Sequence, residues 1–139
     1  MLVVKTKILQ SRVEGIGLFA DQFISKGTIT WKFKPKFDIY FDQSEVDTMS
    51  QMQKDQIIHF AYLSKKSGKY VYSIDNTRFT NHSTSPNIAE DEKLSAGDLE
   101  ICTIAARDIQ SGEEMTVDYR AIDAVDESSD DEYLKMVAP

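Results

Sequence analysis

Three runs of the sequence hold the side chains best suited to chemistry. In this chain of 139 residues they are residues 15–20, GIGLFA, residues 78–87, RFTNHSTSPN, and residues 113–119, EEMTVDY. The first can form a backbone cradle, because glycine has no side chain to keep a ligand away. The second offers amides and an imidazole that can bind a polar ligand. The third ends in a phenol that can donate or accept a hydrogen bond.

Each run also has a plainer interpretation. The glycine run fits G-x-G-x-x-G/A, a dinucleotide-binding pattern, but a turn of that kind must open a helix. No long helix fits before Gly27, so the run predicts a β-turn or a ligand cradle rather than a Rossmann fold. The second run can be a surface loop whose side chains satisfy its own backbone. The third can be a short strand that leads into an acidic tail.

Alternation of apolar and polar residues with a period of two predicts the elements that would position these runs. Short strands are expected at residues 29–33, 37–41, 70–74 and 99–105, each with its apolar side chains on a buried face. Cys102 lies inside the last of these strands and is expected to be a small core residue.

One region has a helical pattern instead. Ser50 and Gln53 have the spacing of a capping box, which predicts the start of a helix running from Gln51 to Leu63. A shorter helical turn is expected just before it. The fold class is therefore α+β, mostly β, with one helical insertion at about residues 44–63.

The segments on either side of this insertion resemble each other. Ile24 is followed three residues later by Gly27, and Ile109 is followed in the same way by Gly112. A β-prone run resumes after each glycine, and glycine suits a turn position with positive φ. The pattern predicts two similar hairpins that flank the helical insertion.

Charge is placed unevenly along the chain, whose net charge is -7. Residues 118–132 hold seven acidic residues against one base, Arg120, and the remainder is close to neutral. This argues against direct nucleic-acid binding, which needs a basic surface, and it permits a basic protein partner.

The overall composition bounds the class of protein further. The length fits one domain, and no stretch approaches the roughly 20 apolar residues of a membrane span. One cysteine and two histidines offer neither a disulfide nor a zinc site, so no metal is expected. The expected location is intracellular, cytoplasmic or nuclear, without secretion or membrane association.

Taken in order, the three runs resemble the SET-domain family of protein-lysine N-methyltransferases. Residues 15–19 begin the match, and residues 72–75, YSID, are similar to the strand before the family's central motif. Residues 78–87 resemble that central motif, and residues 113–119 resemble the closing motif. The resemblance covers roughly residues 5–120.

The resemblance implies a fold and an activity. The fold would be β-clip-like, with small sheets and a C-terminal pseudoknot, in a SET domain at residues 1–122. Residues 123–139 would form an acidic tail that is either a lid or disordered. The activity would be methyl transfer from S-adenosylmethionine to a lysine of a protein substrate, expected to be a basic or histone-like tail. The alternative is a non-catalytic SET module that binds a partner, and a homodimer is compatible with a chain this small.

The resemblance also implies which residues bind the cofactor. The backbone of Glu14, Gly15 and Ile16 would line it. Asn81 would contact the methionine part, and His82 would contact the adenine mainly through its backbone.

Tyr119 would be the catalytic tyrosine, and Phe33 and Glu90 would line the substrate channel. Glu90 lies near a position that can be aromatic in members of the family, so the acidic residue is a departure. No cysteine cluster follows Tyr119, so the zinc-bound closing segment of some members is absent. Another segment would then have to cover the site, and Tyr133 and Leu134 are the candidates.

Overall fold

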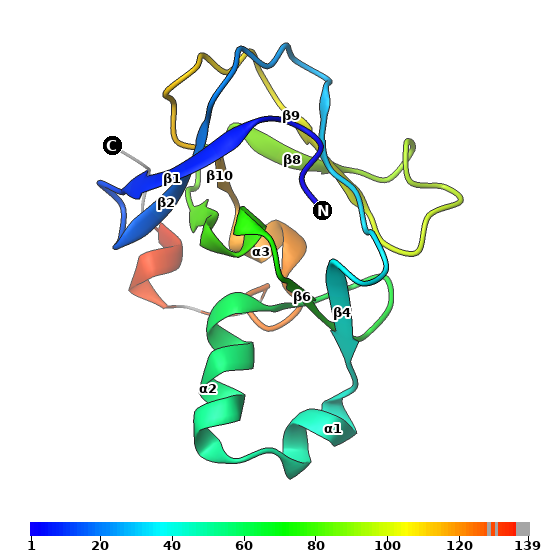
Figure 1. Cartoon of the computed structure of the whole chain (residues 1–139). Helices are drawn as coiled ribbons and strands as arrows, with labels where there is room; N and C mark the ends of the chain where they lie inside the picture. The colour runs from blue at the N-terminus through cyan, green and yellow to red at the C-terminus, as the bar shows by residue number, and fades with distance from the viewer. Residues whose placement is uncertain (128, 130, 136–139) are drawn as a thin grey trace.

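The computed structural model describes residues 1–127, 129 and 131–135 (Figure 1). Its strands are β1 Thr6–Gln10, β2 Ile16–Ala20, β3 Ile29–Trp31, β4 Asp38–Phe41, β5 Tyr62–Leu63, β6 Tyr70–Ser73, β7 Asn81–His82, β8 Ile88–Asp91, β9 Cys102–Ala105 and β10 Thr116–Val117. Its helices are α1 Gln43–Thr48, α2 Gln51–Phe60 and α3 Tyr119–Ile122, with 3-10 turns η1 Asn76–Phe79 and η2 Glu132–Lys135.

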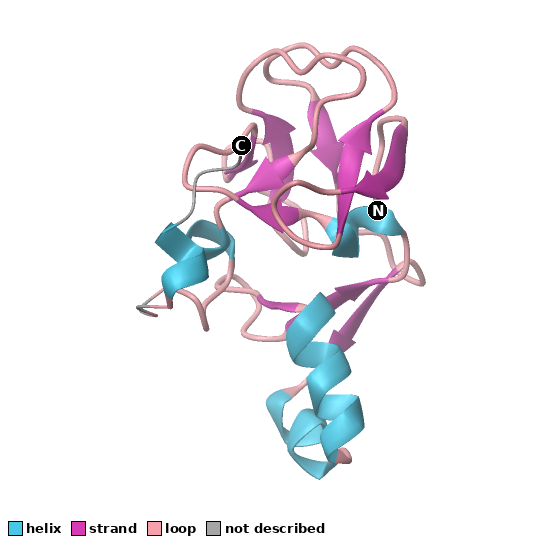
Figure 2. Cartoon of the chain, turned by 90° about the vertical axis from the view of Figure 1, so that its left-hand side faces the viewer, coloured by secondary structure: helices cyan, strands magenta, loops and turns pink. Residues whose placement is uncertain are grey.

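The strands form small sheets, which confirms the predicted mostly β class. Two sheets have two strands, β1-β2 and β10-β7, and two have three strands, β3-β9-β8 and β4-β6-β5. Every pairing is antiparallel except that of β7 with β10. Figure 2 shows the helical insertion extending away from the strand-rich part of the chain.

Two hydrophobic clusters support this arrangement. The main one joins β2, β8, β9 and the closing segment through Leu18, Ala20, Ile24, Ile88, Ala105, Ile109, Met115 and Val117. The second, Val46, Ile57 and Tyr70, packs both helices of the insertion against β6. Burial of such side chains is the main favourable contribution to folding.

The two similar glycine turns pair with each other. Ile24 and Ile109 exchange backbone hydrogen bonds of 2.9 and 2.8 Å. Gly27 and Gly112 each donate an N–H, over 2.8 Å, to the strand that leads into the other segment. Their φ angles are 84° and 92°, which confirms the predicted positive φ. The prediction of two hairpins was wrong, because each turn connects strands of different sheets, β2 to β3 and β9 to β10. The repeated pattern instead joins the two halves of the main core.

Helix α2 begins where the sequence predicts and ends earlier. Ser50 and Gln53 form the expected capping box. The helix stops at Phe60, so the prediction that it continues to Leu63 was wrong. Tyr62 and Leu63 form β5 and pair with β6, because a strand partner is available there and aromatic side chains favour strands.

The buried face of β4 is opposite to the predicted one. Phe37 and Ile39 are 40% and 39% exposed, whereas Asp38 is buried. Its carboxylate accepts hydrogen bonds from the Ser73 hydroxyl at 2.6 Å and from the Lys34 N–H at 2.7 Å. The amino group of Met1 lies 2.6 Å from the second oxygen. A fully paired carboxylate can be buried, and apolar alternation alone does not reveal the partners.

Two other predicted strands are too long. β3 ends at Trp31, and the Phe33 ring stacks on Tyr40 at a centroid distance of 4.7 Å. β9 begins at Cys102, three residues after the predicted start. Just before it, the buried Glu100 carboxylate accepts a hydrogen bond from Tyr40 at 2.7 Å. Side-chain contacts therefore replace strand pairing at both ends. Cys102 itself is buried, as expected.

Candidate active site

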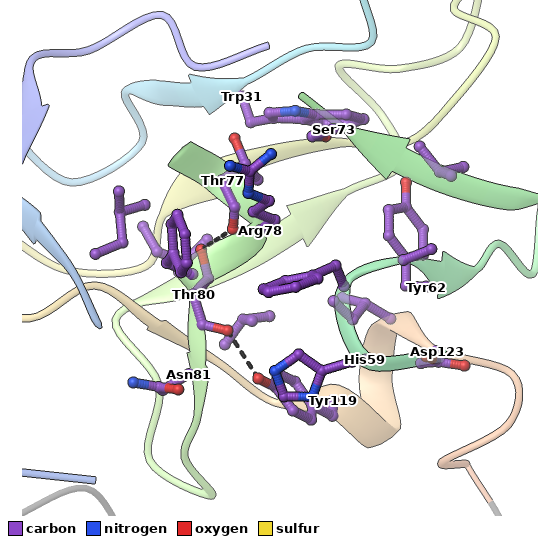
Figure 3. A pocket seen from close by; sticks show the side chains of 18 of the residues that line it. Trp31, His59, Tyr62, Ser73, Thr77, Arg78, Thr80, Asn81, Tyr119 and Asp123 are labelled. Carbon is purple, nitrogen blue, oxygen red and sulfur yellow. Dashed lines mark hydrogen bonds between the residues drawn. The ribbon is translucent and has the colours of Figure 1, made fainter. Parts of the chain in front are cut away.

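A cleft of about 850 Å³ brings most of the predicted site residues together (Figure 3). It is bordered by β2, β3, α2, β6, η1, β8, β9 and α3. Predicted site residues on its lining are Glu14, Gly15, Ile16, Asn81, Glu90 and Tyr119. Phe33 is not part of this lining, and the lining does not include His82, whose imidazole is buried beside it.

Gly15 ends the tight connection between β1 and β2, and the other residues of the glycine run form β2 itself. Gly15 has φ of 48°, and no atom lies within 4 Å of the position where a Cβ would stand. The run ends a β-hairpin turn and continues as a strand rather than a helix, so the Rossmann alternative is excluded. The Asn81 amide donates to the carbonyl oxygens of Glu14 and Ile16 at 3.2 and 3.3 Å. The turn and β7 are thereby held next to each other.

Glu114 ties this corner of the site to the closing segment. Its carboxylate accepts hydrogen bonds from Ser11 at 2.7 and 2.9 Å and from the Asn81 amide at 2.9 Å. A Cβ on Gly17 would stand 2.2 Å from its Oε1 atom. A side chain at the second glycine of the run would therefore displace this carboxylate, which already covers the bare backbone.

Hydrogen bonds join the closing segment to β7 and to the loop that follows β7. The Asn87 side chain donates to the Glu114 carbonyl at 2.8 Å and accepts from the Thr116 N–H at 2.8 Å. The Ser83 N–H donates to the Val117 carbonyl at 3.0 Å. Because these hydrogen bonds join segments far apart in sequence, they fix the position of the residues that follow the closing strand β10.

Those residues include Tyr119, the first residue of α3. Its hydroxyl donates to the Thr80 carbonyl over 2.8 Å, the dashed contact in Figure 3. The Asp118 side chain caps the helix by accepting from the Arg120 N–H. Burial raises the pKa of the Tyr119 phenol well above its usual value, and the charges of Asp126 and Glu14 raise it further. The phenol is therefore neutral at physiological pH.

The His82 imidazole holds two parts of the chain together. Its Nδ1 accepts from the Tyr119 N–H at 3.1 Å, and its Nε2 lies 2.9 Å from the Leu134 carbonyl oxygen. The tautomer with its proton on Nε2 satisfies both contacts. Tyr133 packs edge-on against the imidazole, with ring centroids 6.4 Å apart. Leu134 is fully buried.

The opposite wall of the cleft is the sheet β3-β9-β8. Trp31 and Glu90 both lie opposite Thr103 in register, on either side of it, and all three line the cleft. Two residues of β3 oppose one of β9 here, so Thr30 also reaches the lining. Its hydroxyl lies 2.8 Å from that of Thr103. Directly opposite side chains share one face of a sheet, so this row presents polar groups to the cleft.

The ends of this row carry polar groups without partners. The Trp31 indole N–H is buried with no hydrogen-bond partner among the described residues. Burial raises the pKa of Glu90 to about 7; the Lys65 charge opposes this, and Glu100 and Glu92 add to it. Burial likewise raises the pKa of Tyr62 well above its usual value, with Glu100 and Glu90 among the lesser causes.

Residues 15–120 match the SET-domain family. The chain belongs to this family. Its SET domain is similar to part of an H3 lysine-36-specific histone-lysine N-methyltransferase of Schizosaccharomyces pombe, with 29% identity over 118 residues. It is 30% identical over 121 residues to a Candida albicans protein of the same description. It is 26% identical over 133 residues to the Drosophila melanogaster histone-lysine N-methyltransferase trr.

These matches cover most of this chain and little of the relatives. They span 83%, 83% and 87% of the chain but only 14%, 14% and 5% of the respective relatives. A solved structure of a candidate histone methyltransferase from Plasmodium falciparum has a TM-score of 0.55 and 18% sequence identity. The superposition covers 81% of this chain and 90% of that one, which supports the SET fold.

The described residues hold neither a metal-binding cluster nor a membrane-spanning helix. They contain no group of three or more His, Cys, Asp or Glu side chains placed to hold a metal ion. In the same part of the chain, no helix has the length and apolarity to cross a membrane.

Several residues of this SET domain have roles that the sequence did not reveal. Glu114 stands inside the closing motif, yet nothing in its neighbours signals the contacts with Ser11 and Asn81. The resemblance assigned mainly the backbone of His82, to adenine, and gave no role to its imidazole, which joins Tyr119 to Leu134. Trp31 is buried, and it also lines the cleft.

Proposed function

We propose that this SET domain transfers a methyl group from S-adenosylmethionine to a lysine side chain of a histone or another basic protein. The observation that carries the proposal is the shared cleft of Tyr119, Asn81 and the glycine turn. In family terms these are the catalytic tyrosine and the cofactor-binding motifs. The relatives named above are histone-lysine methyltransferases, which supports the substrate class.

The glycine turn and β7 fit the cofactor. Gly15 leaves open space, and the carbonyls of Glu14 and Ile16 converge with the Asn81 amide. The two carbonyl oxygens keep lone pairs that can accept from the amino-acid end of a ligand while the Asn81 amide holds them in place, and the backbone of His82 continues the same edge. When bound, S-adenosylmethionine supplies an electrophilic methyl group on a sulfonium centre.

Tyr119 is the residue proposed to act on the reacting groups. Its proton is committed to the Thr80 carbonyl, so its oxygen keeps lone pairs that can accept weak hydrogen bonds. Contacts of this kind are directional and serve positioning, which alone can supply a large part of an enzymatic acceleration. The buried, neutral phenol adds no charge to the site.

The charge of the cleft favours a cationic substrate. Its lining carries the carboxyl groups of Glu14, Asp55, Glu90, Asp123 and Asp126 and one guanidinium, that of Arg78. An acidic cleft attracts a basic peptide and speeds its encounter, most strongly at low salt. A histone substrate would require a nuclear location.

The tail is proposed to cover the site. Tyr133 lies on the cleft lining and packs on the rings of His82 and Tyr119, and Leu134 anchors the segment. This favours the lid over the disordered alternative for residues 131–135. Residues 128, 130 and 136–139 of the predicted tail lie outside the described residues.

The test is a pair of measurements on the full chain. Calorimetry with S-adenosylmethionine measures cofactor binding, and radiolabelled methyl transfer to histone H3 and other basic proteins measures activity. Binding together with labelled lysine is the expected result. Binding without label on any protein would favour the interaction module, and absence of binding would contradict the proposal.

A further inference from the structure

Glu90 differs from the other acidic residues of the cleft in its surroundings. It lies on β8, an edge strand of the sheet, at one end of the polar row and opposite Thr103. Its carboxylate makes no hydrogen bond or ion pair with any other residue that the structure describes. A partly buried carboxylate without a partner is costly, and such groups are retained where a ligand completes them.

The charged groups around Glu90 are engaged elsewhere. The Lys65 ammonium donates to a backbone carbonyl at 2.9 Å and pairs with Glu127 at 3.1 Å. The Glu100 carboxylate accepts hydrogen bonds from Tyr40 and Ser64. Glu92 is exposed, and it follows β8 on the chain. None of these groups neutralises Glu90, so the carboxylate is available for a cation that enters the cleft.

We propose that the Glu90 carboxylate receives the amine of the target lysine and takes its proton. The proposal rests on the proposed function and adds a catalytic residue to it. One N–H bond of the ammonium breaks, its electron pair stays on nitrogen, and an O–H bond forms on Glu90. The amine becomes neutral and nucleophilic, and the carboxyl group, which is partly exposed, releases the proton to water when the product leaves.

Proton transfer from the lysine amine to Glu90 is favoured when the pKa of the amine falls and the pKa of the carboxyl group rises. A free lysine amine has a pKa of about 10.4, and the positive sulfonium charge of bound S-adenosylmethionine would lower it. Burial raises the pKa of Glu90 to about 7, against the opposing charge of Lys65 and with help from Glu100 and Glu92. The nearby Tyr62 phenol remains protonated and does not compete as a base. The two pKa values therefore approach each other, as general-base catalysis requires.

The first experiment needs no methyl transfer. The full chain, labelled with ¹⁵N, is titrated with n-butylammonium as a surrogate for the lysine side chain, and binding is followed by NMR. We expect amide shifts on β8 and β9 in the wild type. Glu90→Gln should weaken the binding at least about tenfold, because it removes the charged acceptor. Glu92→Gln is the matched control, with the same change two residues away.

The second experiment measures turnover on histone H3 against pH. Glu90→Gln should lower kcat about 100-fold or more at neutral pH, the usual contribution of a general base. It should also remove the rise in rate near pH 7, while Glu92→Gln keeps it. Cofactor affinity by calorimetry should be unchanged in both variants.

The outcomes distinguish failure of the Glu90 proposal from failure of the proposed methyltransferase function. Equal n-butylammonium binding by the wild type and Glu90→Gln would overturn the Glu90 proposal, as would an unchanged pH profile. If the wild type binds the surrogate through Glu90 but methylates no protein, the amine site stands and the proposed function fails. If methylation occurs and Glu90→Gln retains the wild-type rate, the function stands and the Glu90 proposal fails.

Discussion

The two sides of the cleft are built in opposite ways. At the glycine turn, the polar side chains of Ser11, Asn81 and Glu114 satisfy one another. On the sheet wall, the carboxylate of Glu90 and the indole N–H of Trp31 lack partners among the described residues. Both sides are polar, both border one cleft, and only one is complete without a ligand.

The two sides of the cleft therefore differ in whether their polar groups stabilise the free protein or await a ligand. A satisfied network stabilises the fold and keeps its geometry whether or not a ligand is present. Unpaired groups lower the stability of the free protein and gain partners only when something binds. The turn side would therefore hold the cofactor in a prebuilt frame, and the wall would receive the group that reacts. Substitutions on the two sides should then differ in kind.

Tyr119 lines the same cleft, and its substitution should have the largest effect. Tyr119→Phe removes the hydroxyl that donates to Thr80 and that is proposed to position the reacting groups. Turnover on histone H3 should fall about 100-fold or more, a loss typical for one positioned hydrogen-bonding group. Radiolabelled methyl transfer measures it.

The matched control is Tyr72→Phe. The Tyr72 hydroxyl accepts from Gln56 at 3.0 Å on an exposed surface away from the cleft lining. Its loss should leave turnover within about threefold. A folded Tyr119→Phe protein with the wild-type rate would remove the catalytic role of that residue.

Gly17→Ala should disrupt the hydrogen-bond network at the glycine turn and lower the stability of the protein. The new Cβ would stand 2.2 Å from Glu114 Oε1 and 3.1 Å from Ser11 Cβ. The carboxylate would have to move and release its hydrogen bonds, which should cost about 2 kcal/mol of unfolding free energy. Gly97→Ala, where nothing lies within 4 Å of the added Cβ, should change stability little. Urea unfolding measures both, and equal values would mean that the network adapts freely.

Glu114→Gln tests the same network without adding volume. The carboxylate now accepts charge-assisted hydrogen bonds from Ser11 and Asn81. Removing the charge should weaken them and destabilise the fold by about 1 to 2 kcal/mol. Cofactor affinity should fall as well, because Asn81 loses its anchor. A variant as stable as the wild type would show that the network adds nothing to the complete side.

The ordered motifs of the chain were enough to predict the family, the mostly β class and the capped start of α2. The positive φ of Gly27 and Gly112 also followed from the sequence, because few residues other than glycine adopt it. These features depend on local chemistry or on a motif with a fixed order. The end of α2 did not follow, since the strand partner that captures Tyr62 lies eight or more residues away.

In the candidate site, too, residues within motifs could be predicted, whereas contacts between distant segments could not. Glu14, Gly15, Ile16, Asn81, Glu90 and Tyr119 line one cleft, whereas Phe33 lies outside its lining. The roles assigned to them stay predictions. Asp38 and Glu114 could not be interpreted from their neighbours, because their partners come from distant segments. Buried polar networks depend on tertiary contacts, and a hydrophobic pattern does not encode them.

Glu90→Gln should change stability with the opposite sign to Glu114→Gln, although the chemical change is identical. Burial raises the folded-state pKa of Glu90 to about 7 from the model-peptide value of 4.5, so the folded protein binds more protons than the unfolded chain between those pH values. The stability of the wild type therefore falls as pH rises through that window, and below pH 4.5 the two proteins should be equally stable. Above pH 7 the variant should be more stable by about 1 kcal/mol, a value reduced for partial exposure. Thermal unfolding at pH 4 and pH 8 measures the difference, with Glu92→Gln as the control. If Glu90→Gln destabilises the protein at pH 8, Glu90 has partners that resemble those of Glu114, and the contrast between the two sides of the cleft is lost.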